Sequence, residues 1–165
     1  MPKLSKVLVA DPSAYMASLT VGMLRSIGAQ SVTAVSDSAA TLAALRREKF
    51  DVIVIDDVLA PIDGVELTRQ LRAEDGAANR LVPVIMVFVE ADRQRIETAR
   101  DAGVTEFIKK PLSAKILEAR IVQALDNPRP FITAPAFTGP DRRRRVLKVG
   151  EDRRGENDEP VAKSS

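Results

Sequence analysis

The chain alternates between short runs of β-branched residues and longer segments with a helical spacing of apolar positions. Strong strand-like runs occupy residues 4–10, 51–55 and 82–88, and weaker ones occupy residues 31–35 and 104–108. Runs that are apolar at nearly every position are typical of strands covered on both faces. The pattern therefore predicts five strands of one buried sheet.

Segments of helical length follow each of these runs. They cover residues 12–27, 38–49, 64–73, 93–102 and 113–125. Asp37 and Ser113 are predicted N-caps, and Gly28 and Gly103 suit the position that follows the end of a helix. Strand and helix thus alternate five times, which predicts an α/β fold with a doubly wound, five-stranded parallel sheet and helices on both faces.

The composition changes after the last predicted helix. Four of the ten prolines lie between residues 128 and 140, and a mostly charged segment follows them. Residues 128–165 carry too little apolar surface to fold by themselves. The sequence therefore predicts a globular domain at residues 4–125 and a Pro/Arg-rich, mostly disordered tail at residues 126–165.

Composition also limits the possible chemistry. The 165 residues include no cysteine and no histidine, which excludes disulfides, thiolate or imidazole metal sites and a Ser-His-Asp triad. A metal would have to be a hard cation bound by oxygen, with Mg²⁺ as the first candidate. The chain has neither a membrane-length apolar stretch nor a signal-peptide pattern, so we expect a soluble cytoplasmic protein. We find no nucleophile–base pair that would indicate an enzyme.

Charged residues follow three of the predicted strands. Asp11 comes after the first strand, Asp56 and Asp57 come after the third, and Lys110 lies just past the fifth. In a parallel α/β sheet, ligands bind at the carboxyl ends of the strands. Acids that converge with a lysine suit a hard metal and a phosphoryl group, although an ion-pair cluster at the sheet edge fits the spacing equally well.

Three motifs favour the first interpretation. They are F-D-V-I-V-I-D-D-V-L-A-P-I-D-G at residues 50–64, P-V-I-M-V-F-V at residues 83–89 and F-I-K-K-P-L at residues 107–112. With these motifs at the family's spacing, the sequence from Val7 to about Leu125 resembles a response-regulator receiver domain of the CheY-like, chemotaxis type. The resemblance implies a flavodoxin-like receiver fold and a role in two-component, or phosphorelay, signal transduction.

Two adjacent aspartates compete for the role of phosphoacceptor. Counting eight residues back from Gly64, or five forward from Asp51, gives Asp56 as the acceptor. Successive strand residues point to opposite faces, so Asp57 should be oriented differently. By the resemblance, Asp56 accepts a phosphoryl group from a histidine kinase or a phosphotransfer protein. Because this chain has no histidine, the donor must be a separate protein.

The same resemblance assigns the other site residues. It implies that Asp11, Asp56 and the backbone carbonyl of Val58 hold Mg²⁺. It also implies that Lys110 pairs with the phosphoryl oxygens and precedes a cis peptide bond to Pro111.

Two departures from the family pattern bear on function. Ala10 stands where receivers carry the first of two acids, so Mg²⁺ binding should be weak. Phe88 replaces the usual Thr or Ser, and Phe107, at the switch-aromatic position, also lacks a hydroxyl. An alternative is therefore a degenerate pseudo-receiver that binds partners without phosphorylation.

The tail contains four consecutive arginines, Arg142, Arg143, Arg144 and Arg145, which follow Asp141. Guanidinium groups bind phosphate bidentately and pair with guanine, and an adjacent carboxylate could accept from the guanine edge. The segment resembles the arginine-rich extensions of a subset of chemotaxis-like regulators that bind cyclic di-GMP and act on the flagellar motor. A solvated tail, a protein contact and, less expected, nucleic-acid binding remain open. The output partner, such as a motor protein or a kinase, also remains open.

Overall fold

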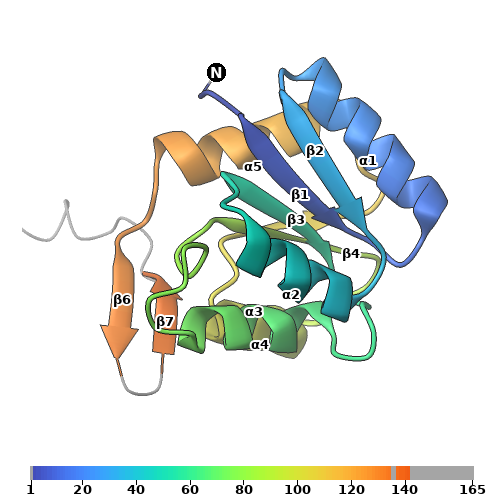
Figure 1. Cartoon of the computed structure of the whole chain (residues 1–165). Coiled ribbons are helices and arrows are strands. Elements are labelled where there is room, and N and C mark those ends of the chain that lie inside the picture. Colours follow the sequence, from blue (N-terminus) through green and yellow to red (C-terminus); the bar gives the residue numbers. More distant parts are fainter. Residues whose placement is uncertain (1, 135–136, 142–165) are drawn as a thin grey trace, which may run out of the picture.

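The computed structural model describes residues 2–134 and 137–141 and has a central parallel sheet between two layers of helices (Figure 1). The strands are β1 (Lys6–Ala10), β2 (Ser31–Val35), β3 (Val52–Asp56), β4 (Val84–Phe88) and β5 (Glu106–Lys109). They are arranged in the order β2-β1-β3-β4-β5, and all neighbours are parallel. This confirms the predicted α/β class and the five-stranded parallel sheet.

The five predicted helices are also present. They are α1 (Ala14–Ser26), α2 (Ser38–Arg47), α3 (Gly64–Ala73), α4 (Arg93–Ala102) and α5 (Ala114–Asp126). Asp37 and Ser113 accept backbone hydrogen bonds as N-caps, and Gly28 and Gly103 have φ of 102° and 103°, all as predicted. None of the described helices has the length and apolar character needed to cross a membrane.

The alternation of side chains along the strands divides the core into two layers. Leu8, Ile53 and Ile55 face the layer packed by α2, α3 and α4. Val7 and Val54, on the opposite parity, face the layer packed by α1 and α5. Because both faces of the sheet are covered, the carboxyl ends of the strands are where polar groups from several elements can meet.

A β-hairpin follows α5 and was not predicted. Strands β6 (Phe131–Ala134) and β7 (Phe137–Pro140) pair antiparallel, and the hairpin lies beside α3 and α4 (Figure 1). The sequence analysis predicted a mostly disordered tail at residues 126–165 and did not foresee this hairpin in its first part. A two-stranded hairpin is marginal alone and is stabilised by packing on another element. Residues 142–165 lie outside the described part of the chain.

Arg72 of α3 holds the hairpin against the domain. Its side chain is 2% exposed, and its guanidinium donates to the carbonyls of Gly103 (3.2 and 3.0 Å) and Arg80 (2.6 Å). The same guanidinium lies 5.1 Å from the ring centroid of Phe131 in β6. Arg80 extends the contact to β7, where it donates to the Thr138 hydroxyl at 3.4 Å. The hairpin thus joins the folded domain through arginine side chains.

Candidate functional site: an acid–lysine centre at the carboxyl edge of the sheet

The shortest ion pair at this edge joins Asp56 and Lys110. Asp56 ends β3 and is 3% exposed, and its Oδ2 accepts a hydrogen bond from Lys110 Nζ at 2.6 Å. Its Oδ1 accepts from the backbone N–H of Val58 at 2.9 Å. The Lys110 backbone N–H donates to the Phe88 carbonyl at 2.8 Å, which fixes the lysine beside the end of β4. Lys110 precedes a cis peptide bond to Pro111, as predicted.

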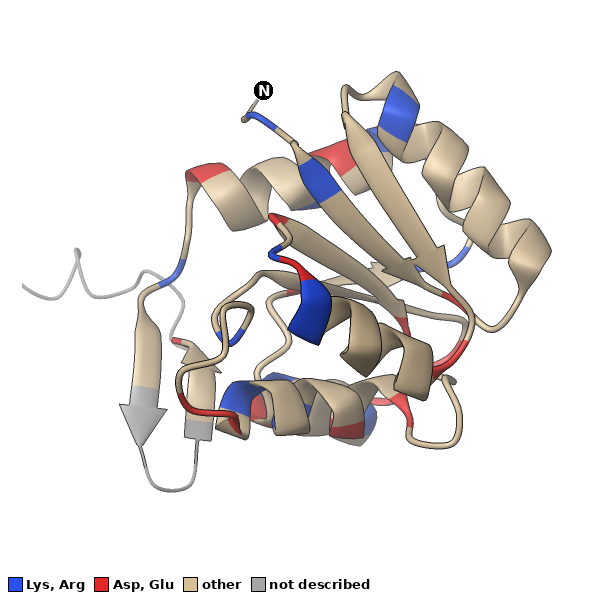
Figure 2. Cartoon of the chain, in the orientation of Figure 1, with Lys and Arg blue, Asp and Glu red and all other residues tan. Residues whose placement is uncertain are grey.

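Asp11 directly follows β1 and lies close enough to this pair for the charges of Asp56 and Lys110 to act on it. Figure 2 shows acidic positions gathered at this end of the strands. Its carboxylate is buried and accepts a hydrogen bond from the Ser13 N–H at 2.8 Å. Burial raises the pKa of Asp11, the Ser13 hydrogen bond works in the opposite direction, and the negative charge of Asp56 raises it further. The net direction is upward, because burial is the strongest of these effects.

Asp57 is buried beside the centre but does not form the lysine pair. The Lys110 side chain donates its hydrogen bond to the Asp56 carboxylate. The backbone N–H of Asp57 donates to the Val87 carbonyl at 3.0 Å, next to the end of β4. Burial raises the pKa of the Asp57 carboxyl, and the charge of Asp56 adds to this, while Arg95 and Lys110 work against it. Asp57 therefore contributes negative charge to the site from a neighbouring position.

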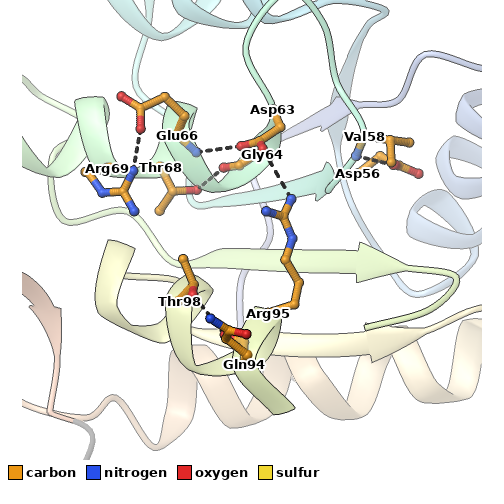
Figure 3. Close-up of polar contacts among 10 residues, drawn as sticks. All are labelled: Asp56, Val58, Asp63, Gly64, Glu66, Thr68, Arg69, Gln94, Arg95 and Thr98. Atoms are coloured by element: carbon orange, nitrogen blue, oxygen red, sulfur yellow. Dashed lines mark hydrogen bonds and ion pairs between the residues drawn. The ribbon is translucent and has the colours of Figure 1, made fainter. Parts of the chain in front are cut away.

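An ion pair that the sequence analysis missed links α4 to the start of α3. Figure 3 shows the Asp63 carboxylate between the backbone N–H of Glu66 and the guanidinium of Arg95. The two contacts measure 2.8 Å and 3.3 Å. Asp63 could have been recognised as an N-cap, because it directly precedes the helical segment at Gly64. Its pairing with Arg95, 32 residues away, depends on the packing of α4 against α3.

The charges at the centre do not balance. Asp11, Asp56 and Asp57 lie around one ammonium group. Burial lowers the pKa of Lys110, but the hydrogen bond to Asp56 and the charges of the three carboxylates outweigh it and raise the pKa above its usual value. Lys110 is therefore positively charged at neutral pH. The excess of buried carboxylate oxygen suits a hard divalent cation.

The donor set for such a cation is small. Within the described residues, no group of three or more acidic side chains could hold an ion by itself. Ala10 is buried at 1% exposure in the layer packed by α2, α3 and α4 and supplies no oxygen from its side chain. Asp11 and Asp56, with backbone oxygen, fit an ion that keeps several of its waters, as Mg²⁺ does in proteins.

Two phenylalanines occupy the region next to the centre. Phe88 ends β4, and its ring meets that of Phe107 edge-on, with centroids 6.5 Å apart and an interplanar angle of 67°. The Arg100 guanidinium lies 5.7 Å from the Phe107 ring centroid. The two predicted switch positions are thus in direct contact through apolar rings.

The structure does not place all of the predicted tail residues. Asp141 is described, and its backbone N–H donates to the Pro130 carbonyl at 2.7 Å, next to the hairpin. Residues 142–145, the predicted nucleotide-binding arginines, lie outside the described residues.

Comparison with known proteins agrees with the geometry of this site. The family model of the response regulator receiver domain matches residues 7–122. The chain is 31% identical to the chemotaxis protein CheY of Pseudomonas aeruginosa over 116 residues, which cover 70% of this chain and 92% of that protein. It is 29% identical to CheY-3 of Vibrio cholerae over 116 residues, with coverages of 70% and 88%.

Solved structures give the same result. One is the receiver domain of a sensor histidine kinase from Pseudomonas aeruginosa PAO1, described with a magnesium ion coordinated in its active-site cleft. It superposes with a TM-score of 0.66 at 26% identity and covers 76% of this chain and 99% of that domain. The chain therefore belongs to the response-regulator receiver domain family, whose CheY-like members are signalling modules of phosphorelay systems.

Proposed function

We propose that this protein is a response regulator that accepts a phosphoryl group on Asp56 and signals through protein contacts. The observation that carries the proposal is the 2.6 Å pair between Asp56 and Lys110 beside a second buried carboxylate, Asp11. We place the protein in the cytoplasm, where a histidine kinase or a phosphotransfer protein would be the donor.

The transfer uses groups that the site already positions. A carboxylate oxygen of Asp56 attacks the phosphorus of a phosphohistidine, the P–N bond breaks, and the imidazole leaves with the donor protein. Lys110, held in its charged form, then pairs with the phosphoryl oxygens. Asp11, Asp56 and the Val58 carbonyl would hold Mg²⁺, which when bound offsets the charge of the transferring group.

The surface around the site supports a protein donor. Four apolar side chains are exposed at this edge of the sheet by 71%, 63%, 60% and 42%: Tyr15, Val58, Val89 and Ile116. They come from α1, from the loops after β3 and β4, and from the first turn of α5. Apolar side chains gathered around a polar centre are typical of a protein-binding surface.

The acceptor can be tested with a small phosphodonor. We expect the full-length protein, incubated with Mg²⁺ and acetyl phosphate, to form an acid-stable, base-labile adduct. Asp56→Asn should abolish this adduct, whereas the matched control Asp57→Asn should keep it. Labelling that persists unchanged in Asp56→Asn would exclude Asp56 as the acceptor.

A second candidate function is a phosphorylation-independent binding module. The contact between Phe88 and Phe107 favours it, because apolar rings occupy both switch positions and neither side chain can hydrogen-bond a phosphoryl oxygen. This candidate requires weak metal binding, so a Mg²⁺ titration of the wild type beside Ala10→Asp separates the two functions. Tight binding by the wild type, equal to that of Ala10→Asp, would remove the main support for the pseudo-receiver.

We further propose that the arginine run at residues 142–145, with Asp141, provides an input through cyclic di-GMP. The support is the local resemblance and the position of Asp141, which the Pro130 hydrogen bond holds beside the hairpin. Guanine recognition should discriminate cyclic di-GMP from cyclic di-AMP, because adenine lacks the O6 acceptor and the N1–H and N2–H₂ donors. Calorimetry on a variant with all four arginines changed to lysine tests this. Undiminished binding would leave only nonspecific charge attraction.

A further inference from the structure

A small polar recess lies at the β5 edge of the sheet, between α4 and α5. It has a volume of about 180 Å³, and its lining side chains are Arg100, Thr105, Glu106, Phe107, Arg120 and Arg129. The three arginines come from three different elements: α4, α5 and the segment that leads into β6. The recess shares no lining residue with the acid–lysine centre, so the proposed phosphoryl transfer does not explain it.

The charges in the recess are unbalanced in the opposite sense to those of the acid–lysine centre. Three guanidinium groups lie around one carboxylate, that of Glu106, whose side chain is 9% exposed. Arg120 and Arg129 each lie 3.7 Å from a Glu106 oxygen. An ordinary N–H···O hydrogen bond is about 2.7–3.2 Å long. Both contacts are thus ion pairs whose N–H donors are not engaged in short bonds to Glu106.

These donors suit a phosphate group. A guanidinium presents five N–H donors in a planar fork, which binds phosphate bidentately. A terminal phosphate offers three oxygens to arginines that approach from three elements, whereas a carboxylate offers only two. The volume of the recess equals that of about six liquid water molecules, enough for a phosphate and part of a sugar.

The buried carboxylate of Glu106 limits which phosphorylated ligands the recess can bind. A buried carboxylate next to a bound anion is unfavourable unless it accepts hydrogen bonds from the same ligand. Ribose hydroxyls or the N–H groups of a base would provide such donors. The Arg100 guanidinium, whose carbon lies 5.7 Å from the Phe107 ring centroid, could also lie against a planar base.

We propose that this recess is a binding site for a phosphorylated ligand that also carries hydrogen-bond donors, as nucleotides and sugar phosphates do. Arg120 and Arg129 bind the phosphate, Glu106 accepts from the hydroxyl or N–H donors, and Arg100 stacks on the remainder. Because Arg129 lies just before β6 and pairs with Glu106 of β5, an occupied recess would also hold the segment that leads into the hairpin against β5.

The test uses the full-length protein, titrated by NMR at physiological salt with inorganic phosphate, ribose 5-phosphate, AMP and GMP. We expect shifts at Glu106 and Phe107 amides and at the arginine Nε–H signals, with the three organic phosphates binding at least about ten-fold more tightly than inorganic phosphate. Equal affinity for ribose 5-phosphate and both nucleotides would assign the donors to the sugar. A preference for GMP would assign them to the base.

Variants distinguish phosphate binding in the recess from nonspecific attraction to positive charge. Arg120→Gln and Arg129→Gln should each weaken binding by about ten-fold. The control is Arg93→Gln on α4, outside the lining of the recess, 92% exposed and paired with Glu97, and it should change nothing. Glu106→Gln should strengthen binding of inorganic phosphate and reduce the preference for ribose 5-phosphate.

The arginine run at residues 142–145 could also attract phosphates, so changing these four residues to glutamine is the remaining control. Binding to the recess should survive that change. Loss of binding in this variant, undiminished binding in both Arg120→Gln and Arg129→Gln, or no binding of any of the four phosphates would each overturn the proposal. Arg120→Gln is decisive if Arg129→Gln detaches the hairpin, because the Arg120 side chain is 48% exposed and outside the hairpin contact.

Discussion

The two ends of the sheet both bury charged side chains, but they compensate these charges in different ways. At the carboxyl end, Asp56 is paired with the ammonium group of Lys110 at 2.6 Å. At the amino end, where α3 and α4 lead back toward the strands, Arg72 is just as deeply buried. Its guanidinium binds the carbonyls of Gly103 and Arg80 and the ring of Phe131.

The two environments shift pKa values for the same reason and with different consequences. Burial lowers the pKa of Arg72 to about 9, and burial raises the pKa values of Asp11 and Asp57. A cluster of full charges responds when a cation binds or a phosphoryl group is added. A single charge held by carbonyl dipoles and a ring is fixed in place. Under the proposed function, the carboxyl end changes its charge when a cation or a phosphoryl group binds, whereas the amino end holds the hairpin in place.

The largest expected loss of stability comes from replacing Arg72. Arg72→Ala removes the hydrogen bonds to the Gly103 and Arg80 carbonyls and leaves a void under the hairpin, so we expect the free energy of unfolding to fall by about 3 kcal/mol. Arg72→Met fills much of the volume without a buried charge and should cost less than half as much. Urea denaturation measures both. Equal losses of stability in the two variants would mean that the hydrogen bonds of Arg72, and not the volume that its side chain fills, stabilise the amino end of the sheet.

Replacing Gly103 should give the next largest loss of stability, and Gly28 provides a control in the same protein. Both Gly103 and Gly28 have positive φ, so an alanine at either position is strained by about 1–2 kcal/mol. At Gly103 a Cβ would also lie 2.8 Å from Arg72 Cγ and from the Thr138 carbonyl, whereas at Gly28 it would meet nothing within 4 Å. We expect Gly103→Ala to cost about 1–2 kcal/mol more than Gly28→Ala.

Amide hydrogen exchange locates the Gly103 effect. Exchange of the backbone amides of residues 137–139 should accelerate in Gly103→Ala and stay unchanged in Gly28→Ala. If both variants lose the same stability and exchange alike, the hairpin does not pack closely against the end of α4.

The smallest expected change in the free energy of unfolding comes from Asp57, at the carboxyl end of the sheet, and it is an increase. The pKa of Asp57 is raised in the folded state, so the ionised carboxylate destabilises the folded protein. The contribution of this group to stability is full below the unfolded-state pKa and is lost as the pH rises through the folded-state pKa. Asp57→Asn should therefore stabilise the protein at pH 7 by on the order of 0.5–1 kcal/mol. The gain should vanish below the unfolded-state pKa of aspartate, about 4. Thermal unfolding across this pH range is the measurement, and a gain that grows on acidification would contradict the assignment.

Much of the fold follows from local pattern. The β-branched runs predicted all five strands of the parallel sheet, and Asp37, Ser113, Gly28 and Gly103 marked helix ends because capping and positive φ depend on neighbouring residues. The spacing of the motifs pointed to the residues at the strand ends, and the sheet brings Asp11, Asp56 and Lys110 together there. These features could be predicted because the side chains and the backbone that positions them are close in sequence.

Other features were decided only by the tertiary structure. The hairpin lies in a proline-rich segment, and it is held by Arg72 and Arg80, more than 50 residues earlier in the chain. Nothing in the sequence distinguishes Arg72 from the exposed arginines, because charged residues are rarely buried without a partner of opposite charge. The recess around Glu106 likewise needs three elements at once. Contacts between distant segments depend on how the helices pack, and no local pattern encodes that packing.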